Sequence, residues 1–499
     1  MRYTRHFVVY TPQIGGVRDK MTGIHTLHEI IYKLFYVYIT KERDIMFEKL
    51  KKIISNSSAD YTDIRYEDKT TTNIGFSGKE LNTIGTNTTN GFVIRVLKKG
   101  GFATITFTKE SDAIKALKIA EENAELLSRH IKKPIRLAET NVIKDNFSPK
   151  LNEDPRKISL EEKLELTRKY NAIPLQYEQI ATTSTRYFDI VREKYFVNSE
   201  GSEINENLIT VGTLAGLTSK DGSLLQSILS GSFGSDGFHN VRNQEENIEN
   251  KTKIVLDLLK ATPVQGGTYN CILNPSLAGV FAHEAFGHFS EADIIEGLPA
   301  MRAKMQIGQK MGMEKLNIID DATMPNQLGF YKYDDEGVSV RKVHLIKNGI
   351  LSGRLHSRRT AAEFGEPISG HMIAEDYRFA PIIRMGNIYI EAGDTTLDEM
   401  FEKLGNGLYI IDAKGGETAG ENFTFGGQYG YIIKKGKKAG MIRDLNISGN
   451  LYQTLNDIAV IGNDLVQNKI GGCGKQQNNF RSSKGGPHIL IYNLIVGGL

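Results

Sequence analysis

The first hundred positions alternate between helical and strand-like spacing of apolar residues. Four apolar residues between positions 47 and 54 lie on one helical face, which predicts a helix beginning at Met46. Polar and apolar residues alternate over 61–67, as in a half-buried strand. Residues 91–96 and 102–107 flank a Lys-Lys-Gly-Gly turn. This pattern predicts a β-hairpin.

Residues 111–217 continue with the same helical and strand-like spacing of apolar positions. Helices are expected over 111–130 and 160–170, joined by a polar, proline-containing connection over 131–160. Residues 187–197 and 208–217 read as strands on either side of an Asn-Ser-Glu-Gly turn. The first half is therefore expected to be a mixed α/β domain with an antiparallel sheet.

A glycine-rich segment over 231–240 separates this half from the next predicted helix, over 245–260. Such a segment could form a phosphate-binding loop, but no Gly-Lys-Ser/Thr follows it, so it is interpreted as an ordinary loop. A short strand is expected over 269–273.

Past residue 330, short apolar runs separated by Gly and Asn/Asp turns predict mainly strands. The predicted strands cover 338–346, 388–391, 407–412, 430–434 and 489–496. The expected fold class is α+β, with a mixed α/β N-terminal domain followed by a β-rich C-terminal domain. The predicted boundaries are 1–45 for an extension, 46–240 for the N-terminal domain and 241–499 for the C-terminal domain.

Composition narrows the functional classes. Lys plus Arg number 62 and Asp plus Glu 59, so the net charge of +3 gives no reason to expect nucleic acid or a membrane surface as a partner. No apolar run approaches the roughly 20 residues that span a bilayer. The two cysteines, Cys271 and Cys473, exclude a disulfide scaffold and favour a reducing, cytoplasmic compartment.

The first 45 residues have a different character. Their apolar stretch over 27–39 is interrupted by Glu29 and Lys33 and lacks the features of a signal peptide. We interpret residues 1–45 as an extension upstream of a natural start at Met46.

The segment from Asn274 to His288 holds the strongest chemical signal. Asn274 suits a helix N-cap and Pro275 the first helical position. Further along, His283-Glu-Ala-Phe-Gly-His288 has the pattern His-Glu-x-x-x-His, one residue longer than the common zinc motif. Five residues of α-helix advance about 140° beyond one turn, which points the two histidines apart. Both can bind one metal only if the helix widens into a π-type turn or ends, and Gly287 is where we expect that distortion.

Glu284 and a third ligand complete the predicted site. Glu284 would face the metal and take a proton from its bound water. Cys473 is the first candidate for the third ligand, because flanking glycines give its sulfur room and Lys475 would favour the thiolate. Zinc suits a set of two histidines and one cysteine with one open position. The other candidates are Glu291, Asp293, His356, His371 and His488.

These motifs together resemble the TldD/PmbA family. The His283–His288 motif with the following Ser-Glu-Ala-Asp resembles the family's metal-binding helix, and Gly-Cys-Gly-Lys ending at Lys475 resembles its C-terminal signature. Between these two motifs, the segments at 384–387, 415–416, 423–425 and 461–464 occur in the expected order. The resemblance runs from about Met46 to the end of the chain.

The resemblance implies a two-domain zinc peptidase that cleaves extended or unfolded peptides. It assigns the metal to His283, His288 and Cys473 and the catalytic role to Glu284. It also implies a dimer, either of two identical chains or with a PmbA/TldE-like subunit. This sequence departs from the family pattern over 294–311, where a Gly/Arg-rich stretch is usual.

Two further expectations concern the substrate and the rival functions. A β-rich domain with open strand edges can hold an extended peptide through its main chain, and the predicted substrate-binding residues are Arg384, Asn387, Gly415 and Gly416. A structural role is the alternative for Arg384. The rival functions are a non-catalytic, peptide-binding partner subunit of a TldD/TldE-like complex and a binding module with a structural metal, which would need four protein ligands.

Overall fold

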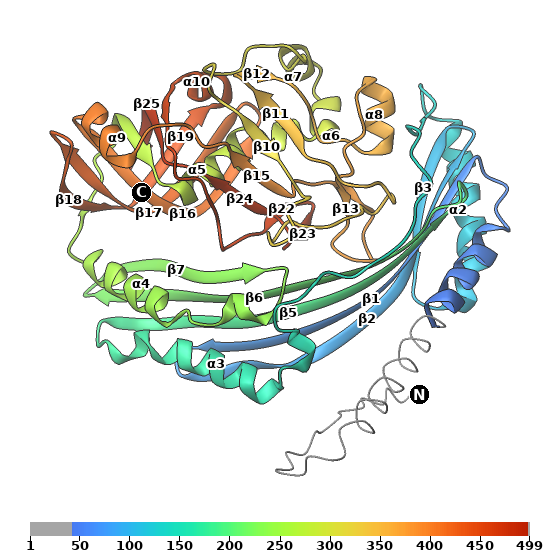
Figure 1. Ribbon diagram of the computed structural model, residues 1–499, viewed down its shortest axis with the longest axis horizontal. Coiled ribbons are helices and arrows are strands. Elements are labelled where there is room, and N and C mark those ends of the chain that lie inside the picture. The colour runs from blue at the N-terminus through green and yellow to red at the C-terminus, as the bar shows by residue number, and fades with distance from the viewer. Residues whose placement is uncertain (1–41, 498–499) are drawn as a thin grey trace, which may run out of the picture. The chain divides into compact units, whose positions relative to one another are not determined.

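One long antiparallel sheet dominates the N-terminal half of the computed structural model, which describes residues 42–497 (Figure 1). Its strands run in the order β3-β2-β1-β5-β6-β4, and β7 pairs with β6. All neighbours are antiparallel except β4 and β6. The strands are β1 (Tyr61–Ser77), β2 (Glu80–Lys98), β3 (Gly101–Phe107), β4 (Lys144–Phe147), β5 (Ile180–Asn198), β6 (Glu203–Asp221) and β7 (Leu224–Gly234).

Helices α2 (Ala113–Ser128), α3 (Leu160–Ala172) and α4 (Glu245–Asp257) pack against this sheet. The predicted hairpin and helices of this half are confirmed, although the strands are longer than their apolar cores suggested. The glycine-rich loop expected over 231–240 is wrong at its start. Residues 231–234 belong to β7, because they pair with residues 211–214 of β6.

Two further sheets build the C-terminal half. The first has the order β16-β9-β25-β19-β17-β18-β8, with β20 beside β25, and a pairing of β16 with β17 closes the path on itself. Its strands are β8 (Thr262–Pro263), β9 (Gly267–Leu273), β16 (Gly407–Ala419), β17 (Asn422–Lys434), β18 (Lys437–Arg443), β19 (Leu445–Asn450), β20 (Ile458–Ile461) and β25 (Ile489–Gly497).

The other sheet has the order β12-β11-β10-β15-β24-β21. Its strands are β10 (Ile318–Asp320), β11 (Val343–Lys347), β12 (Ile350–Leu351), β15 (Asn387–Ile390), β21 (Val466–Gln467) and β24 (Ser483–Gly486). The strand predicted over 338–346 begins only at Val343, because Ser339 forms an isolated bridge with Tyr333 instead. Two small hairpins join β13 (Met372–Ile373) to β14 (Ile382–Ile383) and β22 (Cys473–Lys475) to β23 (Gln477–Asn479).

Helix α5 (Pro275–Ala282) lies between these two sheets and packs against β15, β16 and β24. Its side chains belong to the main hydrophobic core, which also takes residues from both sheets. The other α-helices of this half are α6 (Ala292–Glu296), α7 (Pro299–Lys304), α8 (Arg358–Phe364), α9 (Leu397–Leu404) and α10 (Leu451–Asn456). Among these helices, α5, which precedes the predicted metal ligands, is the most buried.

Buried ion pairs connect the long sheet to the C-terminal half. Asp335 pairs with Arg65 at 3.1 Å and with Lys194 at 3.0 Å, and Glu336 pairs with Arg95 at 3.1 Å. Burial would raise the pKa of Asp335, but the positive charges of Arg65, Lys194 and Arg192 hold that pKa far below its usual range. Removing one partner from such a buried pair typically costs about 3–5 kcal/mol, so these charges fix the sheet against this segment.

The chain divides into two compact units, Met1–Leu50 and Lys51–Leu499. Of the first unit, residues 42–50 are described and are helical. The predicted helix is therefore present, but its predicted start at Met46 is wrong, because residues 42–45 are already helical. The predicted extension over 1–45 lies almost wholly outside the described residues. Within 42–497, no helix is both long enough and apolar enough to cross a membrane.

Candidate metal centre

The helix that leads into the site begins where the sequence predicts. The Asn274 side chain accepts a hydrogen bond from the main-chain N–H of Leu277 at 3.0 Å, and Pro275 occupies the first helical position. A capped N-terminus and a fully buried apolar body hold α5 rigidly. The residues at its C-terminal end are therefore presented from a fixed support.

A π-helical turn follows α5 directly, over His283–Gly287. The predicted widening of the helix is confirmed. The turn brings the imidazole rings of His283 and His288 to 4.9 Å between centroids. Without it, a five-residue spacing would point the two rings about 140° apart.

Gly287 lies in this turn, but backbone freedom is not the reason for it. Its φ of −55° is ordinary for any residue. A Cβ at this position would instead meet Met385 Sδ at 2.2 Å and Ile388 Cδ1 at 2.8 Å. A larger residue here would have to displace these two side chains, because the neighbouring segment packs directly on the turn.

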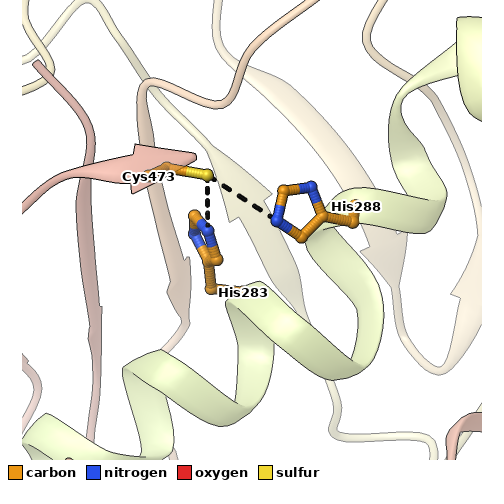
Figure 2. A group of neighbouring side chains, drawn as sticks. All are labelled: His283, His288 and Cys473. Carbon is orange, nitrogen blue, oxygen red and sulfur yellow. Dashed lines mark hydrogen bonds between the residues drawn. The ribbon is translucent and has the colours of Figure 1, made fainter. Parts of the chain in front are cut away.

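Three potential ligands converge beyond the turn. Figure 2 shows the Cys473 sulfur facing both imidazoles, at 3.1 Å from His283 Nε2 and 3.6 Å from His288 Nε2. One donor atom from each residue lies within 4.8 Å of the other two. Two imidazole nitrogens and a thiol are donors that zinc favours, and three protein ligands leave one position open. This donor set fits a catalytic zinc ion.

Cys473 reaches the histidines because Arg384 holds its hairpin in place. The guanidinium of Arg384 donates to the main-chain oxygens of Cys473 at 2.6 Å and Gln477 at 2.8 Å. The side chain is 1% exposed and does not line the pocket at the site. Arg384 therefore supports the cysteine segment, which is the structural role that the sequence left open as an alternative. It does not contribute to the surface of the pocket, where a substrate contact was predicted.

Asn387 is also fully buried. Its side chain accepts from the N–H of Gly329 at 2.9 Å and donates to the main-chain oxygen of Asp321 at 2.8 Å. The structure does not bring it to the pocket that contains the histidines. Gly415 and Gly416, by contrast, do line that pocket.

Glu291 supports the second histidine. His288 Nδ1 donates to Glu291 Oε2 at 3.1 Å, which turns Nε2 toward Cys473. Carboxylates commonly orient metal-binding histidines in this way. The same oxygen accepts from the Lys475 ammonium at 3.1 Å, and Lys475 also contacts Asp293 at 2.9 Å. The Lys475 ammonium therefore neutralises two carboxylates. We expected it to stabilise the Cys473 thiolate directly, but its contacts are with Glu291 and Asp293.

The two histidines have opposite electrostatic environments. Burial and the nearby charge of Lys484 lower the pKa of His283 well below its usual value. Burial also acts to lower the pKa of His288, but hydrogen bonds to Cys473 and Glu291 outweigh it and raise that pKa to about 10. A metal ion would have to displace the proton from His288, because only a neutral imidazole is a ligand.

Glu284 lies beside the three donors and contacts strand β16. Its Oε2 accepts a hydrogen bond from the Thr418 hydroxyl at 3.0 Å and lies 4.0 Å from His288 Nε2. Thr418 could not be identified from the sequence, because its position depends on the pairing of distant strands. The Gly415-Gly416 pair nearby, at a bulge in β16, was the one available signal.

Gly416 leaves room for the Glu284 side chain. A Cβ at this position would meet Glu284 Cγ at 2.8 Å and Cδ at 3.1 Å. Gly416→Ala should therefore displace the carboxylate and lower, by about tenfold, the rate of a reaction in which Glu284 transfers a proton, corresponding to roughly 1.4 kcal/mol. Gly440→Ala on β18, where a Cβ meets nothing within 4 Å, is the control. Equal rates for Gly416→Ala and wild type, at equal zinc content, would contradict this role.

The remaining ligand candidates are engaged elsewhere or act indirectly. His356 contacts Glu366 at 3.0 Å, His371 contacts Asp320 at 3.0 Å and His488 contacts Asp464 at 2.5 Å. Within the described residues, the group of His283, His288 and Cys473 is the one that could hold a metal. Ile294 and Leu298, at the start of the unusual 294–311 segment, line its pocket of about 570 Å³.

Comparison with known proteins places these features in one family. Residues 62–125 match the model of PmbA/TldA metallopeptidase domain 1 and residues 153–261 that of the central domain. Residues 266–498 match the model of the C-terminal domain, which contains all three potential ligands.

Individual relatives cover nearly the whole chain. A metalloprotease of Synechocystis sp. is 33% identical over 445 residues, which is 89% of this chain and 96% of the relative. A zinc metalloprotease TldD homolog of Saccharolobus solfataricus is 31% identical over 460 residues, or 91% of this chain and 100% of the relative. The structure of TldE from Thermococcus kodakarensis has a TM-score of 0.71 at 18% identity, covering 91% and 99% of the two chains. The last likeness shows the fold alone, and it agrees with the α+β fold expected from the sequence.

Proposed function

Because this chain belongs to the PmbA/TldA metallopeptidase family, we propose that it is a zinc-dependent peptidase whose metal is held by His283, His288 and Cys473. One observation carries the proposal. Three zinc-type donors lie within 4.8 Å of one another, and Glu284 stands beside them in the same pocket. The three donors favour a catalytic metal over a structural one, which would be enclosed by four protein ligands.

The residues around the donors have distinct roles in this proposal. When bound, zinc supplies Lewis acidity that polarises a peptide carbonyl and makes water easier to deprotonate. Glu284 accepts the proton of the attacking water and passes it to the leaving amine. Thr418 fixes the Glu284 carboxylate, and Glu291 fixes the His288 imidazole.

The substrate that fits this site is an extended or unfolded peptide. Strand β9 pairs with residues 408–410 of β16, so the following residues of β16 have one edge without a strand partner in the described part of the chain. That edge includes Gly415 and Gly416 beside Glu284. A peptide added along it would be held by main-chain hydrogen bonds, which impose little sequence selectivity.

The same proposal includes the setting of the enzyme. It works in the cytoplasm as a dimer, either of identical chains or with a TldE-like subunit. The likeness to TldE supports such a pairing at the level of the fold. The rival function, a non-catalytic partner subunit, would not need the three donors, Glu284 and Thr418 to be arranged together.

Metal analysis combined with cleavage of an unfolded substrate tests the proposal. The purified protein should contain about one zinc ion per chain and should hydrolyse an unfolded protein, such as reduced and alkylated ribonuclease A, but not the same protein in its folded, disulfide-bonded form. Treatment with a chelator should abolish cleavage, and added zinc should restore it. A fully reduced, folded protein that binds no zinc, or one that cleaves equally well after chelation, would refute the proposal.

A further inference from the structure

Two pockets meet at the catalytic glutamate. The pocket of about 570 Å³ contains the three potential ligands, and a second pocket of about 660 Å³ extends from Glu284 toward β7, α4 and the start of α5. Both pockets are lined by Glu284, Gly415, Gly416 and Lys484. They therefore form one continuous cleft, and Lys484 lies at its junction next to the residue proposed to activate water.

Lys484 is held firmly but its charge is not neutralised. It belongs to β24, where it lies opposite Ile388 of β15, and its main-chain oxygen accepts a hydrogen bond from Asn468 N at 2.8 Å. The side chain is half-buried, and its ammonium has one long contact, to the main-chain oxygen of Gly472 at 3.4 Å. Among residues 42–497, no carboxylate forms an ion pair with it.

The other half-buried lysines of the cleft have carboxylate partners, whereas the exposed Lys469 has no ion pair among the described residues. Lys251 pairs with Asp412, and Lys475 pairs with both Glu291 and Asp293. Glu284 and Glu417 line the same pocket as Lys484, but neither pairs with it. A partly desolvated ammonium without a counter-charge is unfavourable, and an anion that enters the cleft would offset this cost.

We propose that Lys484 binds a carboxylate of the peptide substrate close to the scissile bond, so that the enzyme selects peptides that carry an acidic group at that position. The inference rests on the proposed peptidase function and adds a selectivity that the main-chain contacts along β16 do not provide. The carboxylate can belong to an aspartate or glutamate side chain or to the C-terminus of the peptide. Both present the same chemistry to the ammonium, and matched peptides separate them.

The test uses the zinc-loaded full-length protein and one parent peptide that it cleaves. Asn is replaced by Asp at each of the three positions on either side of the scissile bond, and the C-terminus is made as an acid or an amide. Wild type should cleave the acidic member of at least one matched pair with a kcat/KM about tenfold higher, as a charge-assisted hydrogen bond would give. An effect confined to an Asp position identifies a side-chain carboxylate, and one confined to the acid/amide pair identifies the C-terminus.

Three variants connect the selectivity to this residue. Lys484→Met should bring the acid-to-neutral ratio close to one, and Lys484→Glu should favour a matched Lys-containing peptide. Lys434→Met, which removes an exposed lysine of β17 outside both pockets, should keep the wild-type ratio. Zinc content measured in each variant should match wild type, because none of the changes removes a donor.

The outcomes separate this inference from the proposed function. Equal kcat/KM for acidic and neutral peptides at every position in wild type would overturn the role of Lys484 while zinc-dependent cleavage stands. A preference that survives in Lys484→Met would overturn it as well. Absence of zinc-dependent cleavage of any peptide would instead refute the proposed function, and this inference with it.

Discussion

Replacing Glu284 by glutamine should lower kcat for peptide cleavage by about 10²–10⁴-fold, because the amide cannot accept the proton of the attacking water. The change is nearly isosteric, so the hydrogen bond from Thr418 can be kept by the amide oxygen. Glu284 is not one of the three convergent donors. Zinc content should therefore remain at the wild-type level, and KM should change far less than kcat.

Steady-state kinetics with an unfolded peptide and metal analysis of the same sample measure both quantities. Glu402→Gln, on the exposed side of α9, serves as a matched carboxylate control and should cleave at the wild-type rate. A Glu284→Gln variant with full zinc content and a wild-type kcat would show that another group activates the water. Loss of zinc in this variant would show instead that Glu284 is needed to hold the metal.

The local geometry of the site could be predicted from the sequence because it depends on neighbours in the chain. The spacing of His283 and His288 is incompatible with one metal on a regular α-helix, so a widened turn followed from helix geometry alone. Asn274 and Pro275 fixed the start of the helix for equally local reasons. Glu291 also lies near His288 in sequence, which made it one of the candidate ligands, and the structure shows it bonded to His288 Nδ1 instead.

The contacts made across the fold could not be predicted in this way. Thr418 reaches Glu284 across 134 positions, through a bulge in β16 whose pairing no local pattern determines. Lys484 stands in the cleft because β24 lies parallel to β15, a neighbour almost a hundred positions earlier. The distorted turn at Gly287 is present as predicted, but the backbone there needs no glycine, and the close contact is with the Met385 side chain on a separate segment. Arg384 and Asn387 were chosen as substrate contacts from the resemblance, and only tertiary burial shows their supporting contacts.

Replacing Cys473 by serine should remove the metal while leaving the fold intact. The thiol is the donor that faces both imidazoles, and a serine hydroxyl is a much weaker zinc ligand. Changes in residues that only orient ligands cost about 10–100-fold in metal affinity, so loss of a ligand itself should weaken zinc binding by at least about 100-fold. Cleavage should fall in parallel, and competition with a chromogenic chelator measures the affinity.

The hairpin should survive this substitution because Arg384 bonds the main-chain oxygen of Cys473 and not its sulfur. The zinc-free forms of wild type and Cys473→Ser should therefore unfold at similar temperatures, and added zinc should stabilise the wild type alone. Cys271→Ala is the matched control, because that thiol is fully buried in β9 away from the site. It should lose about 1 kcal/mol of stability through the small cavity and keep its zinc. Undiminished zinc affinity in Cys473→Ser would mean that the two histidines recruit a different third ligand, and the reading of this centre would have to change accordingly.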